Sequence, residues 1–82
     1  LPNYPNPFNA GTTISFTLPR EERVKLSVFN ILGQRVADLL DGSMGAGAHK
    51  IVWQADQMPS GLYFCTFEAG AFSQTQRMLL LK

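Results

Sequence analysis

The chain is poor in the residues from which most catalytic and metal sites are built, because its 82 residues include one cysteine and one histidine. The single cysteine, Cys65, excludes a disulfide within the chain. One histidine and one cysteine in separate segments do not form a metal-ligand cluster. No paired carboxylates, nucleophile motif or phosphate-binding loop stands out. The composition therefore favours a protein that is not an enzyme and that holds no metal or cofactor.

Charge and long apolar runs are also scarce. Charged residues make up 16% of the chain, the net charge is +1, and the basic residues form no run, so a nucleic-acid or anionic-lipid surface is not indicated. No apolar stretch approaches the ~20 residues that span a bilayer, and the first residues lack the pattern of a signal peptide. Leu1 in place of an initiator Met suggests a piece of a longer protein or a processed product.

The hydrophobic residues that are present alternate with polar ones. In residues 12–18, Ile14, Phe16 and Leu18 share one face, and residues 23–30 alternate again. Further short strands are expected in residues 34–40, 49–53, 62–68 and 72–81, and residues 62–68 are apolar on both faces. Short alternating segments between frequent turn signals predict an all-β fold, an Ig-like antiparallel β-sandwich of about seven strands. The expected core residues are Ile14, Phe16, Leu26, Val28, Trp53 and Phe64.

Three segments depart from this alternation. Residues 1–11 contain Pro5 and Pro7 and are expected to form an extended lead-in to a sandwich spanning residues 12–82, with Tyr4 and Phe8 packed on its edge. Residues 41–48 hold three glycines and predict a loop or hairpin. Residues 36–40 could form one helical turn instead of a strand.

Several side chains are candidates for chemistry, but a structural role is favoured for each. His49 is in phase with Ile51 and Trp53, which predicts a half-buried ring bonded to backbone. Cys65 lies in an apolar strand, where a buried, inert thiol is expected. Trp53, Tyr63 and Phe67 could form a platform for sugars, although in so small a domain a core position is favoured.

The order of motifs resembles a known family. The stretches "YPNPFNAGTTISFTLP", "VKLSVFNILGQRVADLLDG", "GAHKIVW", "MPSGLYF" and "QRMLLLK" are similar to a type A C-terminal sorting domain of the type IX secretion system, over residues 4–82. The flagellar hook-cap Ig-like domain shares much of this pattern. Gln76 stands where this family usually has Lys or Arg, and the adjacent Arg77 can take that role.

The resemblance implies a C-terminal secretion signal behind a cargo domain in the same chain, with residues 1–11 as the linker. The folded sandwich would be recognised, after transit through the periplasm, by an outer-membrane translocon and its shuttle protein. A surface sortase often removes such a domain, and the cargo reaches the cell surface or the medium. The residues expected by resemblance to carry recognition are Pro59, Gly61, Tyr63, Arg77, Met78, Leu80 and Lys82.

Two other functions remain open at this point. The domain could be a non-catalytic Ig-like spacer or assembly domain, or, as a third possibility, a carbohydrate-binding module. For the sorting signal, the terminal apolar strand is expected to be available to a partner, for example by adding to the edge of its sheet.

Overall fold

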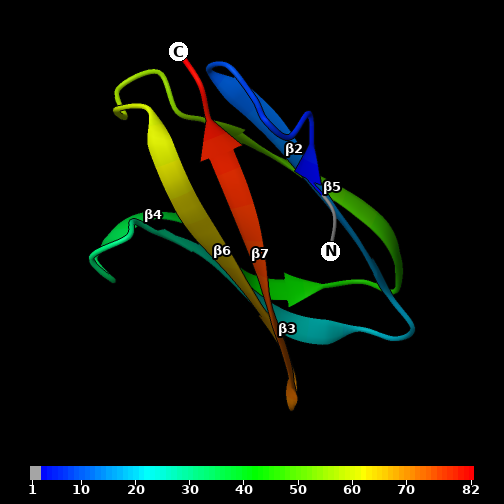
Figure 1. Ribbon diagram of the computed structural model, residues 1–82. Helices are drawn as coiled ribbons and strands as arrows, with labels where there is room; N and C mark the ends of the chain where they lie inside the picture. The colour runs from blue at the N-terminus through cyan, green and yellow to red at the C-terminus, as the bar shows by residue number, and fades with distance from the viewer. Residues whose placement is uncertain (1–2) are drawn as a thin grey trace.

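The computed structural model describes residues 3–82, which form seven strands in two antiparallel sheets packed face to face (Figure 1). The strands are β1 (Asn3–Tyr4), β2 (Gly11–Leu18), β3 (Glu22–Phe29), β4 (Arg35–Met44), β5 (Gly47–Gln54), β6 (Gly61–Ala69) and β7 (Phe72–Leu80).

One sheet has the order β1-β2-β5 and the other β4-β3-β6-β7. This is an immunoglobulin-like arrangement. In the strand letters used for such domains, β1, β2 and β5 correspond to A, B and E, and β4, β3, β6 and β7 correspond to C′, C, F and G. The predicted all-β sandwich is therefore confirmed. The helical turn considered for residues 36–40 is wrong, because pairing with β3 holds these residues in β4.

The core lies between the two sheets and is built from the inward face of each strand. The buried hydrophobic residues are Phe8, Ile14, Phe16, Leu18, Val24, Leu26, Val28, Trp53, Ala55, Tyr63, Cys65, Phe67, Ala69, Met78 and Leu80. Of the predicted core, Phe64 alone is misplaced, since it is half-buried on the outer face of β6. Its strand is apolar on both faces, so alternation could not decide which face points inward.

The predicted loop at residues 41–48 is wrong for most of its length. β4 continues to Met44 and β5 begins at Gly47, so only two residues connect them. The ladder with β3, from Glu22 opposite Met44 onwards, keeps this glycine-containing segment extended. Because β4 and β5 belong to different sheets, the connection crosses between the layers and does not form a hairpin.

The lead-in segment is attached to the sandwich. Asn3 and Tyr4 pair with Ile14 and Thr13 of β2, and Phe8 forms a parallel bridge with Leu80. The expected packing of Phe8 is confirmed, whereas that of Tyr4 is wrong, because its side chain is 82% exposed. Successive residues of a strand point to opposite faces, so the burial of Asn3 turns Tyr4 outward.

Candidate functional site

Two segments expected to carry recognition, residues 59–63 and residues 77–82, lie side by side. In the β6–β7 ladder Gly61 is opposite Leu80 and Tyr63 is opposite Met78. Figure 1 shows the end of β7, the chain's C-terminus and the loop that precedes β6 at one end of the molecule. The fold therefore brings segments that are well separated in sequence into one region.

The predicted residues divide into buried and exposed sets. Tyr63, Met78 and Leu80 are part of the core, with at most 4% of each exposed. In the folded domain these three side chains support the region from inside and do not offer it a contact surface. The side chains of Pro59, Arg77 and Lys82 are exposed and can meet a partner.

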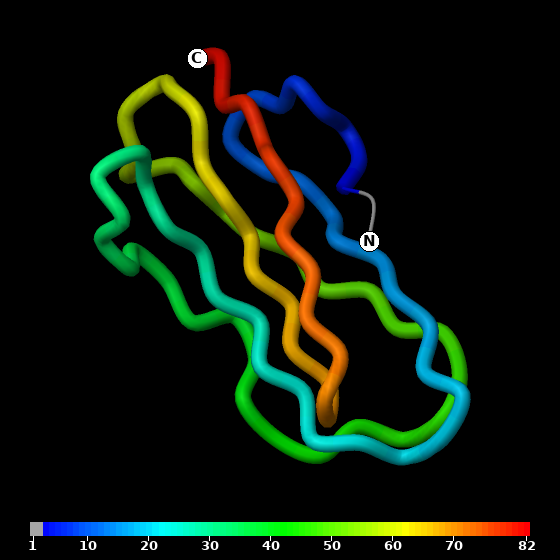
Figure 2. Tube along the Cα trace, turned by 60° about the horizontal axis from the view of Figure 1, so that its bottom comes forward, coloured from blue at the N-terminus to red at the C-terminus, as the bar shows by residue number. Residues whose placement is uncertain are grey.

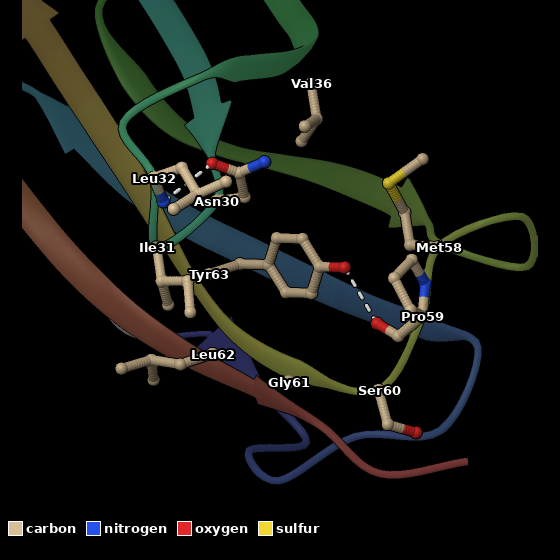
Figure 3. Close-up of a pocket in the computed structure, with 10 residues that line it drawn as sticks. All are labelled: Asn30, Ile31, Leu32, Val36, Met58, Pro59, Ser60, Gly61, Leu62 and Tyr63. Carbon is tan, nitrogen blue, oxygen red and sulfur yellow. Dashed lines mark hydrogen bonds between the residues drawn. The ribbon is translucent and has the colours of Figure 1, made fainter.

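Tyr63 fixes the loop before β6. Its hydroxyl donates a hydrogen bond to the carbonyl oxygen of Pro59, at 2.7 Å, and the ring points toward Pro59 (Figure 3). This tyrosine corner is a known feature of immunoglobulin-like sandwiches, where it closes the turn into strand F. Gly61 enters β6 at φ +151°, a backbone angle that glycine adopts readily and other residues rarely do.

The C-terminal residue is held by the same loop. The backbone N–H of Lys82 donates to the hydroxyl of Ser60 at 3.0 Å, and its ammonium group donates to the carbonyl oxygen of Asp56 at 2.6 Å. Both bonds are exposed to solvent. The loop and the end of the chain therefore form one connected surface.

A surface pocket of about 450 Å³ lies beside this loop and is mostly apolar (Figure 3). Its lining residues are Asn30, Ile31, Leu32, Val36, Met58, Pro59, Ser60, Gly61, Leu62 and Tyr63. Ile31 and Leu32, in the turn between β3 and β4, are 70% and 77% exposed. Exposed aliphatic side chains next to a pocket are typical of a contact surface.

Asn30 shapes the turn that carries these two residues. Its side-chain oxygen accepts hydrogen bonds from the backbone N–H groups of Leu32 at 2.9 Å and Gln34 at 3.0 Å. Neither Ile31 nor Leu32 was predicted from the sequence as a surface residue. A signal was present, since Asn30 and Gly33 are typical turn residues and connecting turns lie on the surface of a protein.

The outer edge of β7 is partly occupied, which corrects the expectation of a freely available terminal strand. Asn6 accepts a hydrogen bond from the N–H of Leu79 and donates one to the carbonyl oxygen of Arg77, both at 3.1 Å. Phe8 continues the contact, because its N–H donates to the oxygen of Leu79 and its own oxygen accepts from the N–H of Leu81, both at 2.9 Å. The lead-in thus covers the edge next to the last residues of the chain.

The remaining candidates have structural environments. His49 is half-buried and its Nε2 lies 2.7 Å from the carbonyl oxygen of Gly45, as expected. Trp53, Tyr63 and Phe67 are buried, so they belong to the core. Cys65 is fully buried, as predicted, and this burial raises the pKa of its thiol to about 12. Within residues 3–82, no three His, Cys, Asp or Glu side chains gather as metal ligands would.

Comparison with known proteins gives one family. A family model described as "Secretion system C-terminal sorting domain" matches residues 3–81. No curated protein and no solved structure matches the chain. Across the part of the chain that the structure describes, no helix has the length and hydropathy to cross a membrane. The chain therefore belongs to the C-terminal sorting domains of type IX secretion, which direct a larger cargo protein to the cell surface or the extracellular space.

Proposed function

We propose that the domain is recognised as a folded sandwich, after transit through the periplasm, by the outer-membrane translocon and the shuttle protein of the type IX system. The observation that carries this proposal is the β6–β7 register, which pairs Gly61 with Leu80 and Tyr63 with Met78. The loop at Pro59 and the chain end at Lys82 come together only when this ladder forms. Recognition of that combined surface therefore requires folding.

The residues proposed for recognition act in two ways. Tyr63, Met78 and Leu80 hold the loop and β7 from the core side, and Gly61 permits the backbone path between them. The exposed side chains of Pro59, Arg77 and Lys82 form the contact surface, together with the aliphatic residues of the β3–β4 turn. The domain performs no chemistry of its own in this process.

Residues 1–11 are proposed as the linker to the cargo, and a surface sortase as the enzyme that removes the domain. Asn3, Asn6 and Phe8 are hydrogen-bonded to the sandwich. Proteases require an extended, accessible backbone. The sortase therefore acts on the N-terminal side of Asn3 or after these contacts open.

A reporter fusion tests the proposal. The domain is placed behind a fluorescent protein with a periplasmic signal peptide, in a bacterium with a type IX system. We expect the reporter at the surface or in the medium, and in the periplasm when residues 78–82 are deleted. Equal export in a strain without the translocon would contradict the sorting function and favour a spacer domain.

A second variant separates recognition of a fold from recognition of a linear motif. Leu26 is buried in β3, outside the proposed site, so Leu26→Asp unfolds the domain and leaves residues 59–63 and 77–82 unchanged. We expect this fusion to stay in the periplasm. Export of the unfolded variant at the rate of the parent would show that a linear signal is read.

A further inference from the structure

The outer face of the four-stranded sheet is apolar at the end near the chain's C-terminus. Phe29 of β3 lies opposite Phe64 of β6, which lies opposite Arg77 of β7. The next cross-strand pair towards the C-terminus is Leu62 and Leu79. These four hydrophobic side chains are half-buried, and with the exposed Ile31 beyond them they form a surface that we call the outer patch.

The other half of the same face is polar. Ser27, Thr66 and Thr75 form the next cross-strand row, and Lys25, Glu68 and Ser73 form the row after it. Such a surface is ordinary for a solvent-facing sheet. The contrast between the halves makes the outer patch a local feature.

Arg77 borders the outer patch without a charged partner. The exposed arginines at positions 20, 23 and 35 each pair with a carboxylate. Among residues 3–82, Arg77 forms no ion pair with a carboxylate, and its cross-strand neighbour is the apolar Phe64. A guanidinium group beside an apolar surface provides a fixed donor for a carboxylate at the rim of an interface.

We propose that the outer patch docks onto a protein surface that presents a cluster of apolar side chains with a carboxylate beside it, and that Arg77 pairs with that carboxylate. The proposal rests on the proposed function, since the partner is a component of the export machinery. It adds a specific face of the sheet to the recognition surface and gives Arg77 a specific kind of partner.

The charges disfavour other occupants. A second copy of the chain, packed patch to patch about a two-fold axis, would place two Arg77 side chains, neither with a carboxylate partner, in one apolar interface. A membrane surface would gain only about 1 kcal/mol from a single basic residue. A protein surface that is partly apolar and acidic matches both the hydrophobic side chains of the outer patch and the positive charge of Arg77.

Site-specific photo-cross-linking in the exporting bacterium tests which partner is bound. A photoreactive phenylalanine analogue replaces Leu79 in the reporter fusion, and in the control it replaces Thr75, on the same strand and face but in the polar half. We expect position 79, and not position 75, to cross-link to a component of the type IX system with an Asp or Glu near the cross-linked residue. Cross-linking to a second copy, to the cargo or to lipid would overturn the proposal.

Charge variants provide the quantitative test. Arg77→Glu is expected to slow export at least tenfold, and Arg77→Lys to retain most of it. Lys50→Glu is the control with the same change of charge, at an exposed position of β5 in the other sheet, and is expected to export as the parent does. Ile31→Ser, a second change at an exposed position, is expected to slow export without altering the melting temperature.

The outcomes separate this inference from the proposed function. Failure of the parent fusion to need the type IX translocon overturns the function. Normal dependence of the parent on the translocon, combined with normal export of both Arg77→Glu and Ile31→Ser, overturns the docking surface alone. If Arg77→Glu unfolds the isolated domain, as measured by circular dichroism, Ile31→Ser and the cross-linking result decide.

Discussion

At the scale of single residues, the asparagines of the opening motif act as substitutes for backbone. Pro5 and Pro7 carry no N–H, so the segment between them cannot pair as an ordinary strand. The side-chain amide of Asn6 offers N–H donors and a carbonyl acceptor, the same kinds of group that a peptide bond offers. It donates to the oxygen of Arg77 and accepts from the N–H of Leu79 on the edge of β7. The combination of Pro and Asn is thus a means of closing this edge.

The first prediction concerns this amide. Asn6→Ala removes the side-chain partner of two backbone groups of β7. Because both bonds are exposed to solvent, water can replace this partner, and the free energy of unfolding is expected to fall by about 0.5–1.5 kcal/mol. Hydrogen exchange at the Leu79 amide should become faster. Asn9→Ala is the matched control, because the exposed Asn9 side chain makes no hydrogen bond to a described residue. Equal stability of the two variants would contradict this role of Asn6.

The second prediction concerns pH. Burial raises the pKa of the Cys65 thiol from 9.0 to about 12, so the folded state keeps a proton that the unfolded state releases near pH 9. The stabilisation is complete below pH 9 and is lost as the pH rises towards 12, with a limiting slope of ~1.4 kcal/mol per pH unit. Denaturant titrations from pH 8 to 10.5 should show a steeper decline for the parent than for Cys65→Ala. Parallel declines would contradict the shifted pKa.

At the scale of elements, alternation predicted the strands and most of their inward faces. It worked for β2 and β3, where polar and apolar residues alternate. It did not work for Phe64, because β6 is apolar on both faces. The outward-facing apolar residues of β6, Leu62 and Phe64, belong to the outer patch. Tertiary pairing with β3 also overrode the glycine signal at residues 41–48, which local propensity cannot anticipate.

The candidate site was predicted in part. The motifs identified the β6 loop and the last strand, but the register that joins them depends on folding. The exposed Ile31 and Leu32 required knowledge of what surrounds the β3–β4 turn. The roles of Tyr63, Met78 and Leu80 were also hidden, because a residue that shapes a site and one that contacts a partner look the same in a motif.

The third prediction belongs to the turn into β6. Gly61 has φ +151° and open space around it, so a side chain meets backbone strain and no clash. Gly61→Val is expected to cost about 1–3 kcal/mol and to displace the Pro59 loop, which leaves the reporter in the periplasm. Gly42→Val is the control, since Gly42 also has open space but no positive φ. Equal melting temperatures and equal export of the two variants would contradict a role for this backbone angle.

At the scale of the whole molecule, the two edges of the larger sheet are protected differently. β4, at one edge, carries Asp38 and Asp41 and pairs irregularly with β3, and such features discourage the addition of further strands. β7, at the other edge, is covered near its end by Asn6 and Phe8. Figure 2 shows the lead-in running beside β7 towards the C-terminus. The lead-in therefore joins the two layers along this edge.

The last prediction follows from that position. Phe8 is 2% exposed and its ring packs against Trp53, with centroids 5.7 Å apart. A truncated domain that begins at Gly11 loses this buried ring and the bonds of Asn6 and Phe8 to β7. Loss of a buried Phe costs about 3–5 kcal/mol, a large share of the stability of so small a domain.

The truncated domain should therefore unfold at much lower denaturant concentration and should expose the edge of β7. Phe8→Ala in the full chain should account for most of the loss, whereas Tyr4→Ala, which removes an exposed ring, should have little effect. An unchanged unfolding midpoint after truncation would mean that the sandwich folds independently of its lead-in.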